Sequence, residues 1–303
     1  MPPPNILWGI DVGGTKIEGV SLRSGKQLEI ISRIRIPTEK EKGYQHIITQ
    51  INKLYRELKE KTGESPNEIG IAIPGTHDPR RQTIKNANTT SLIGKPLLHD
   101  LQKTLQLPVK LANDANCFAL AEAKFGAAHR LNPNAEIVFG IIMGTGVGGG
   151  IVANGSIIKG LHGIAGEWGH NFLDESGGTC YCGKTGCVET VISGPALEKY
   201  YYELSGNSKT LKEINYLHGQ GSDSHASKTI HRLCHYFGKG VARVINIIDP
   251  EILVIGGGLG NIKSLYTEGV KETKKYIFNH SLKTTFAQPE LGDSAGVIGA
   301  ALL

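Results

Sequence analysis

Apolar and polar positions follow two periodicities along this chain, and together they predict its strands and helices. Strand-like runs occupy residues 6–12, 17–23, 28–36, 69–74, 109–112, 136–143, 150–158 and 252–256. Helical periodicity covers residues 41–62, 97–105, 115–125, 194–204, 209–217, 224–248 and 262–277, with a terminal helix from Ser294. In the first of these, Ile47, Ile51 and Leu54 belong to one apolar stripe. Because strands and helices alternate repeatedly, the pattern predicts an α/β fold in which helices cover sheets.

Two predicted strand pairs are joined by glycine-rich loops, one in each half of the chain. The first loop follows Asp11 and contains Gly13, Gly14, Thr15 and Lys16; the second contains Gly144, Thr145 and Gly146. Backbone amides in such turns, helped by a threonine hydroxyl, are suited to binding phosphate, and Asp11 is suited to orienting a hydrated Mg²⁺. The alternative is that both loops are ordinary hairpin turns.

The second loop also satisfies the GxGxxG pattern of dinucleotide-binding proteins, through Gly144, Gly146 and Gly149. That pattern requires a following helix, whereas here Asn154-Gly155 between apolar pairs predicts a β-hairpin. The sequence therefore argues against a Rossmann site. A third glycine run, Gly256-Gly257-Gly258, lies between a strand and a predicted helix and is suited to binding a nucleoside or its phosphates. Close packing of strand against helix is the alternative for this run.

One histidine and three clustered cysteines predict a metal site. His170, Cys180, Cys182 and Cys187 form a Cys₃His set suited to a closed structural zinc site, with a single residue between the first two cysteines. A disulfide would leave an odd cysteine and would need an oxidising compartment.

Asp114 follows one predicted strand and precedes a helical run. From the local sequence it is suited to capping that helix, and a strand end facing a cleft equally suits a catalytic carboxylate. The residues alone leave both roles open.

Composition narrows the function class. The chain has 303 residues and a net charge of +5, with basic and acidic residues intermixed and no basic stripe, so nucleic-acid binding is not indicated. No apolar run approaches the roughly 20 residues that span a bilayer, and the first five residues lack signal-peptide features. Five cysteines, an odd number, fit a reducing compartment, and we expect a cytoplasmic protein without membrane partners.

The motifs together resemble the ROK group of the actin-like ATPase superfamily over nearly the whole chain. They are Asp11 to Lys16, Pro74-Gly75, Asn113 to Asn116, Met143 to Gly150, Gly166 to His170, Cys180 to Glu189 and Ile255 to Gly260. The resemblance implies two ribonuclease-H-like lobes around a cleft and a homodimer. It places a small lobe at 1–112, to which a C-terminal helix at 290–303 returns, and a large lobe with the zinc loop at 113–289.

The resemblance also implies roles for individual residues, with Asp114 as the general base of an ATP-dependent sugar kinase. The residues implied to bind sugar are Gly75, Asn88, Asn113, Asp114, Glu167, His170 and Glu189. Those implied to hold ATP with Mg²⁺ are Asp11, Gly13, Gly14, Thr15, Lys16, Gly144, Thr145, Gly146, Gly256, Gly257 and Gly258.

Within the group, the motifs look most like bacterial fructokinases of the manno(fructo)kinase type. We therefore expect phosphorylation of D-fructose at its 6-hydroxyl, with an N-acetylhexosamine kinase or a glucokinase as the alternative. A sugar-responsive regulator is a further alternative, but its helix-turn-helix would precede the first strand, which begins near residue 6.

Overall fold

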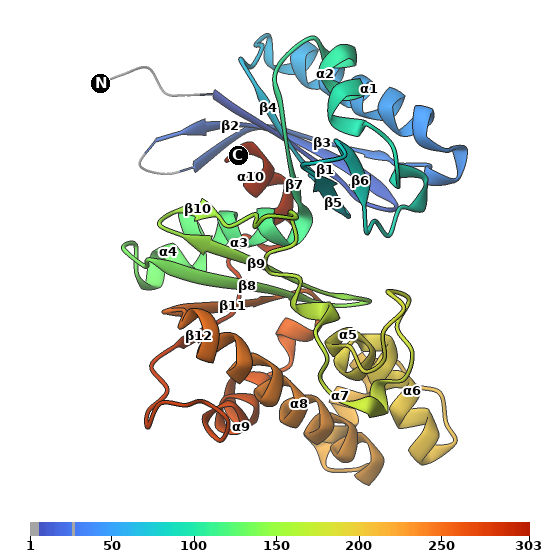
Figure 1. The fold of residues 1–303 in the computed structure, drawn as a ribbon, viewed down its shortest axis with the longest axis vertical. Coiled ribbons are helices and arrows are strands. Elements are labelled where there is room, and N and C mark those ends of the chain that lie inside the picture. Colours follow the sequence, from blue (N-terminus) through green and yellow to red (C-terminus); the bar gives the residue numbers. More distant parts are fainter. Residues whose placement is uncertain (1–5, 26–27) are drawn as a thin grey trace. The chain divides into compact units, whose positions relative to one another are not determined.

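A computed structural model describes residues 6–25 and 28–303, so the opening segment, in which the sequence predicts no signal peptide, lies outside it. The chain forms two compact units (Figure 1). The first comprises the residues up to Pro133 together with Gly150–Ala165 and Glu290–Leu303, and the second comprises Asn134–Gly149 and Gly166–Pro289. Residues 113–133 and 150–165 thus belong to the first unit, whereas the division expected from the sequence assigns them to the large lobe.

The first unit is built on a five-stranded sheet with the order β3-β2-β1-β4-β7. These strands are β1 (Ile6–Val12), β2 (Lys16–Ser24), β3 (Leu28–Pro37), β4 (Ile69–Ile73) and β7 (Val109–Asn113). Strands β1, β2 and β3 form an antiparallel meander, whereas β4 pairs in parallel with both β1 and β7. A small antiparallel pair, β5 (Thr76–Asp78) and β6 (Thr83–Lys85), follows β4. The carboxyl ends of β1, β4 and β7 therefore lie at one edge of the sheet.

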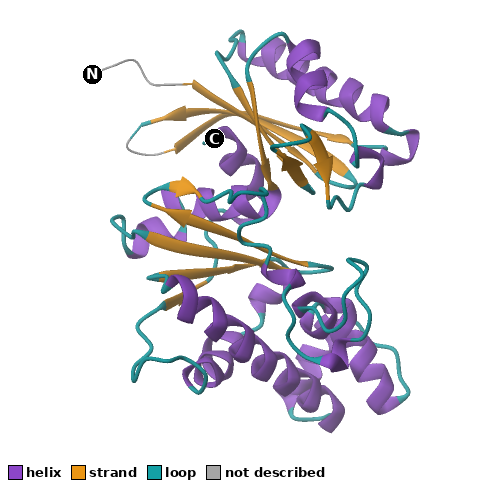
Figure 2. Cartoon of the chain, viewed as in Figure 1, coloured by secondary structure: helices purple, strands orange, loops and turns teal. Residues whose placement is uncertain are grey.

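Strand β4 shows why both faces of this sheet are covered. Its alternate residues Ile69, Ile71 and Ile73 pack into a core cluster with the apolar faces of α1 (Tyr44–Thr62) and α2 (Leu97–Leu105). Ala72 instead joins a second cluster that includes Cys117 and Ala300. Cys117 lies on α3 (Asp114–Lys124) and Ala300 lies on α10 (Ala295–Ala301), so these two helices pack against this face of the sheet. A short helix, α4 (Ala127–Leu131), follows α3 (Figure 2).

Glycines allow the C-terminal helix α10 to lie directly on the backbones of its neighbours. A Cβ atom added at Gly9 of β1 would lie 2.3 Å from the carbonyl oxygen of Val297, and one at Gly70 of β4 would lie 1.7 Å from that of Ala300. Within α10 itself, a Cβ at Gly299 would lie 1.8 Å from the Cys117 carbonyl oxygen. These distances exclude any larger residue, so α10 is an integral layer of the first unit.

A second five-stranded sheet has the order β10-β9-β8-β11-β12. Its strands are β8 (Ile137–Met143), β9 (Val147–Ala153), β10 (Ser156–Ile157), β11 (Ile252–Gly256) and β12 (Thr285–Ala287). Strand β11 is parallel to β8 and β12. The helices of the second unit are α5 (Val188–Ile192), α6 (Gly194–Ser205), α7 (Leu211–Gln220), α8 (Ser224–Ile248) and α9 (Val270–Lys274). The long amphipathic α8 contacts the other four, so one buried face organises this helical layer.

The α/β prediction is confirmed, and most predicted elements agree with the structure to within a few residues. The predicted strand 150–158 is instead two strands, because Asn154 (φ 49°) and Gly155 (φ 69°) form the expected two-residue hairpin turn. The predicted helix 262–277 is shorter and less regular than expected: it spans residues 264–274, and its π-helical turn at Leu265–Gly269 runs directly into the five-residue α9. Gly269, a poor helix former packed closely on Phe237, lies where the two segments join. In the described part of the chain, no helix combines the length and apolarity needed to cross a membrane.

Candidate functional site

The β1–β2 loop of the first unit is a tight turn beside the half-buried carboxylate of Asp11. The Gly13 amide donates to the Lys16 carbonyl oxygen (2.9 Å), and the Thr38 hydroxyl donates to the Gly13 carbonyl oxygen (2.7 Å). At the end of β1, the pKa of Asp11 is raised to about 7, chiefly by burial and then by the neighbouring carboxylates of Asp114 and Glu18. Such a carboxyl is poised to take up a cation, because a positive charge would relieve both effects.

Asp114 and Asn113 divide the role of capping helix α3. The N-cap residue is Asn113, whose Oδ1 accepts a hydrogen bond from the Ala115 amide (2.9 Å). Asp114, which the sequence also suited to that role, is the first helical residue, and its own Oδ1 accepts from the same amide (2.8 Å). Asp114 therefore lies in the first turn of α3, with its carboxylate near that of Asp11.

The sugar-binding residues predicted for the first unit lie at neighbouring strand ends. Asn113 and Ile73 are paired at the carboxyl ends of β7 and β4. Asn113 Nδ2 donates to the Gly75 carbonyl oxygen (3.4 Å). The Asn88 amide donates to the Pro74 carbonyl oxygen (3.1 Å), which leaves the exposed Asn88 side chain beside this connection. The structure thus brings Gly75, Asn88, Asn113 and Asp114 into one neighbourhood.

In the second unit, a glutamate supports the glycine loop between β8 and β9. Glu189, in the first turn of α5, accepts a hydrogen bond from the Val147 amide (2.8 Å). A Cβ atom at Gly146 would lie 2.6 Å from the same carboxylate oxygen. Its side chain is half-buried, and through this hydrogen bond it fixes the loop.

A cavity of about 550 Å³ opens beside this loop within the second unit. It is lined by Gly144, Thr145, Gly194, Pro195, Glu198, Leu211, Lys212, Asn215, Gly258, Leu259, Asn261 and Ile262. Lys212 and Asn215, both on α7, were not predicted. Although Thr210 and Glu213 form the capping box that starts α7, nothing in the local sequence shows which face of the helix meets a cavity.

The glycine run after β11 serves two purposes. Gly256 ends the buried strand, and Gly257 has a φ of 76° and would place a Cβ 2.2 Å from the Met143 carbonyl oxygen. Close packing therefore explains Gly257, in agreement with the packing alternative for this run. Gly258 lines the cavity and begins a 3₁₀ turn rather than the helix expected there.

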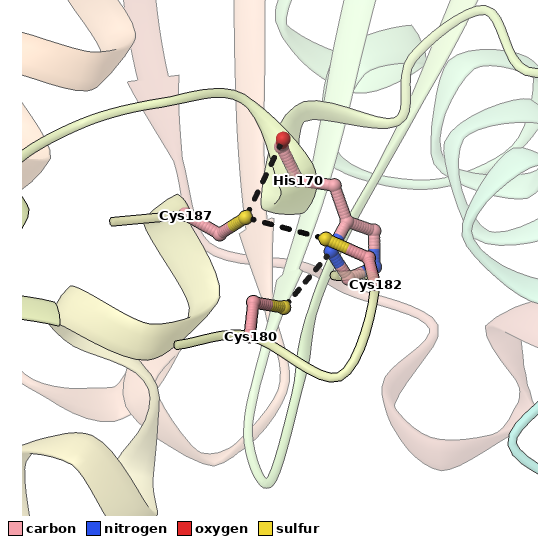
Figure 3. A group of neighbouring side chains, drawn as sticks. All are labelled: His170, Cys180, Cys182 and Cys187. Atoms are coloured by element: carbon pink, nitrogen blue, oxygen red, sulfur yellow. Dashed lines mark hydrogen bonds between the residues drawn. The ribbon is translucent and has the colours of Figure 1, made fainter. Parts of the chain in front are cut away.

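The predicted metal ligands form one cluster in the second unit (Figure 3). The ligand atoms of His170, Cys180, Cys182 and Cys187 all lie within 4.8 Å of one another. Two contacts, His170 Nδ1 to Cys180 Sγ and Cys182 Sγ to Cys187 Sγ, measure 3.6 Å each. Tetrahedral zinc, with Zn–S near 2.3 Å and Zn–N near 2.0 Å, separates its ligands by about 3.5–3.8 Å. The cluster therefore has the donor set and spacing that zinc requires.

The second nitrogen of His170 is also engaged. Its Nε2 lies 2.9 Å from the hydroxyl of Tyr181, a residue between the first two cysteines. With Nδ1 turned toward the cysteines, this contact fixes the ring in the way that outer hydrogen bonds orient metal-binding histidines. A sugar hydroxyl could reach His170 Nε2 only by replacing Tyr181. Glu167 immediately precedes the 3₁₀ turn Trp168–His170, and its carbonyl oxygen accepts a hydrogen bond from the His170 amide (3.4 Å).

Comparisons with known proteins agree with this geometry. A model described as the ROK family matches residues 7–303. The N-acetyl-D-glucosamine kinase of Yersinia enterocolitica serotype O:8 is 36% identical over 311 residues, covering 98% of this chain and 99% of the relative. The ROK hexokinase from Thermus thermophilus has a TM-score of 0.86 at 30% identity, covering 98% and 97% of the two chains. A ROK family glucokinase from Streptomyces griseus, in complex with glucose and AMPPNP, has a TM-score of 0.79 at 27% identity, covering 98% of each chain.

Proposed function

The chain belongs to the ROK family, and from that premise we propose that this sugar kinase transfers the γ-phosphoryl group of ATP to the 6-hydroxyl of N-acetyl-D-glucosamine. Family membership rests on the match over residues 7–303, and the chain has the actin-like ATPase fold of its structural neighbours. The choice of sugar rests on one observation. The N-acetyl-D-glucosamine kinase of Yersinia enterocolitica is 36% identical over essentially the whole of both chains.

This choice replaces the D-fructose expected from the motifs. The segments that looked fructokinase-like are short, and they include loop and metal-site residues whose roles in holding the fold do not depend on the sugar. The full-length relatives favour the N-acetylhexosamine alternative instead. Hexoses share most hydroxyl positions, so motifs that bind these shared groups carry little information about the substituent at the 2-position.

Asp114 is the base in this proposal. Phosphoryl transfer passes through a loose transition state, so the protein mainly positions the reactants and stabilises charge. A carboxylate at the end of β7 and the start of α3, fixed by the Ala115 amide, is suited to accept the proton of the sugar 6-hydroxyl. Gly75, Asn88 and Asn113 surround it and supply amide and carbonyl groups for the other hydroxyls.

Asp11 and the two glycine loops form the phosphate-binding part of the proposal. Mg²⁺ supplies charge neutralisation at the β- and γ-phosphates when ATP binds. Asp11 is placed to hold its hydration shell, and the turn at Gly13 to Lys16 offers amides beside it. In the second unit, Gly144, Thr145 and Gly258 line a cavity of about 550 Å³, a size suited to a small-molecule ligand such as the nucleoside.

The Cys₃His cluster has a structural role in this proposal. Burial raises the pKa of the Cys187 thiol to about 12, and a zinc ion at the cluster would hold the sulfurs as thiolates instead. Glu167 directly precedes the 3₁₀ turn that ends at His170, so a metal held by His170 would fix the segment that carries the two predicted sugar residues Glu167 and His170.

A sugar panel with a coupled ADP-release assay tests the proposal. We expect N-acetyl-D-glucosamine to have the highest kcat/KM, about tenfold or more above glucose, mannose and fructose. Fructose ahead of N-acetyl-D-glucosamine would restore the motif-based expectation and reject the sugar proposed here. Absence of ADP release with every hexose, in protein that binds sugar, would reject the kinase itself.

A further inference from the structure

A second, smaller cavity lies entirely within the first unit, next to the proposed sugar residues. Its volume is about 230 Å³. Strand β5 contributes His77, the end of β7 contributes Asn113, and α3 contributes Asn116. Lys159, from the segment after β10, also lines it. The space exceeds several times the roughly 30 Å³ that one water occupies, but it is smaller than a typical drug-sized ligand pocket.

Two polar side chains of this cavity have buried atoms without a hydrogen-bond partner. Asn116 is only 6% exposed, and its Oδ1 is buried and unpaired. His77 Nε2 is likewise buried and unpaired. Buried polar atoms are normally paired, because an unmade hydrogen bond costs the full desolvation of the group. Two such atoms in one small cavity make it suited to a ligand with complementary hydrogen-bonding groups.

The charges around the cavity favour a neutral polar ligand. Burial lowers the pKa of His77 and the charge of Lys159 adds to this effect, while Asp78 opposes it. The ring is therefore neutral at pH 7 and offers Nε2 as a single donor or acceptor. Lys159 is largely exposed, and Asp78 is paired with Lys85 (3.1 Å). A buried anion would therefore have little positive charge to offset its loss of hydration. An amide group, in contrast, can donate to Asn116 Oδ1 and accept from His77 Nε2.

Asn113 connects this cavity to the proposed reaction centre. It lines the cavity, and its Nδ2 donates to the carbonyl oxygen of Gly75, one of the proposed sugar residues. The next residue in the chain is Asp114, the proposed base. A sugar held by Asn113 and Gly75 therefore lies beside the cavity, and a substituent on its ring can extend into it.

We propose that this cavity receives the N-acyl group of the sugar, with Asn116 and His77 as the residues that select it. The amide N–H donates to Asn116 Oδ1, the acyl oxygen accepts from His77 Nε2, and the methyl group contacts apolar atoms of Pro79 and Leu111. The inference rests on the proposed function and deepens it. Glucose lacks the amide and leaves both polar atoms unpaired, so it is bound less well.

The test replaces each polar side chain by an apolar one of similar size, in separate His77→Phe and Asn116→Leu variants. For each, kcat/KM is measured with N-acetyl-D-glucosamine and with glucose. We expect the ratio of the two values to fall about tenfold or more, because the N-acylated sugar loses a hydrogen bond that glucose never makes. His99→Phe, on the exposed face of α2, is the matched control and keeps the ratio of the native chain.

A thermal melt of each variant without sugar separates binding from folding. We expect the melting temperature to stay the same or rise, because an apolar side chain removes a buried group that lacks a partner. A second probe is N-propionyl-D-glucosamine, which the native cavity should accept with kcat/KM within about tenfold of the N-acetyl sugar, since it adds only one methylene.

The outcomes distinguish this inference from the function on which it rests. If the native chain prefers N-acetyl-D-glucosamine and both variants keep that preference, the cavity holds only water and the inference is wrong. A variant that loses activity with both sugars equally, with a lower melting temperature, identifies a structural side chain and also contradicts it. If the native chain prefers fructose or glucose, the proposed function fails first, and the inference fails with it.

Discussion

The loop at Asp11 to Lys16 and the loop at Gly144 to Gly146 share a backbone design but differ in their charges. Each joins two neighbouring strands of a five-stranded sheet and presents glycines and a threonine. The first lies near two carboxylates, Asp11 and Asp114, that raise each other's energy when ionised. The second is held by one carboxylate, Glu189, through a hydrogen bond to the Val147 amide. Two similar turns thus differ in the acidic groups around them, and the proposed function assigns them different tasks.

The largest expected effect is the loss of kcat when Asp114, next to the first loop, is replaced. Asp114→Asn keeps the shape of the side chain and the bond from the Ala115 amide but cannot accept the substrate proton. We expect kcat to fall about 10²-fold or more, as loss of a general base implies, with sugar binding still measurable by calorimetry. A purified variant with near-native kcat would show that Asp114 only supports helix α3.

The next effect concerns the Cys₃His cluster, in which Cys187 directly precedes the helix α5 that carries Glu189. Cys182→Ser removes one of four ligands, and we expect metal affinity to fall by about 10- to 100-fold or more and the sugar KM to rise. Metal analysis of protein purified without added zinc measures the first change. Cys117→Ser, which alters a cysteine in the first unit, is the control. Full metal content and an unchanged sugar KM in Cys182→Ser would contradict a structural metal at this cluster.

Replacing Asp11 and Glu189 by neutral residues should change the free energy of unfolding in opposite directions, which separates the two regions further. The folded pKa of Asp11, about 7, lies above the ordinary value near 4, so folding favours the protonated form. The stability this group contributes is complete below about pH 4 and is lost as pH rises through 7. Asp11→Asn should therefore be more stable than the native chain at pH 8, by about 1–3 kcal/mol, although its activity falls.

The difference between the Asp11→Asn variant and the native chain should shrink as the pH is lowered toward 4. Denaturant unfolding at pH 5 and pH 8 measures it. Glu189→Ala, in contrast, leaves the Val147 amide without its acceptor and should destabilise the second unit by about 1–2 kcal/mol at both pH values. Equal, pH-independent losses in both variants would mean that the two carboxylates play the same structural part.

The smallest expected effect tests His170, which is proposed both as a metal ligand and as a sugar-binding residue. Tyr181→Phe removes the hydroxyl that lies 2.9 Å from His170 Nε2. If sugar reaches this nitrogen, the sugar KM should fall by about 2- to 10-fold, because a competing hydrogen bond has gone. An unchanged KM together with unchanged metal content would assign His170 to the metal alone.

Periodicity and turn chemistry were enough to predict most of the fold. The apolar stripe of α8 and the Asn154-Gly155 turn each carry a strong local signal, and both elements lie where they were expected. Short elements such as β5, β12 and α5 were missed, because three to five residues cannot show a period. The π-helical turn that leads into α9 was missed as well, because a single turn of altered spacing leaves no periodic signal in the sequence.

For the candidate site, the sequence identified the residues better than it identified their partners. The Cys₃His cluster could be predicted because cysteines and a histidine at that spacing have few other uses, and the structure does bring the four side chains together. Asn116, by contrast, lies in a recognised motif yet was assigned no role, since only the structure shows its Oδ1 buried beside His77 in one cavity. The sequence suggested Asp114 as the cap of α3, whereas Asn113 is the N-cap in the structure; both residue types are good caps, so the local pattern could be read one residue too late.

The most direct test of the account is to identify the product by nuclear magnetic resonance. The native chain is incubated with N-acetyl-D-glucosamine, ATP and Mg²⁺, and the ³¹P and ¹³C spectra show which oxygen carries the phosphate. We predict that the native chain forms a 6-phosphate ester and that Asp114→Asn forms it at least about 10²-fold more slowly. Phosphate on any other oxygen, or a 6-phosphate produced equally fast by Asp114→Asn, would contradict the account.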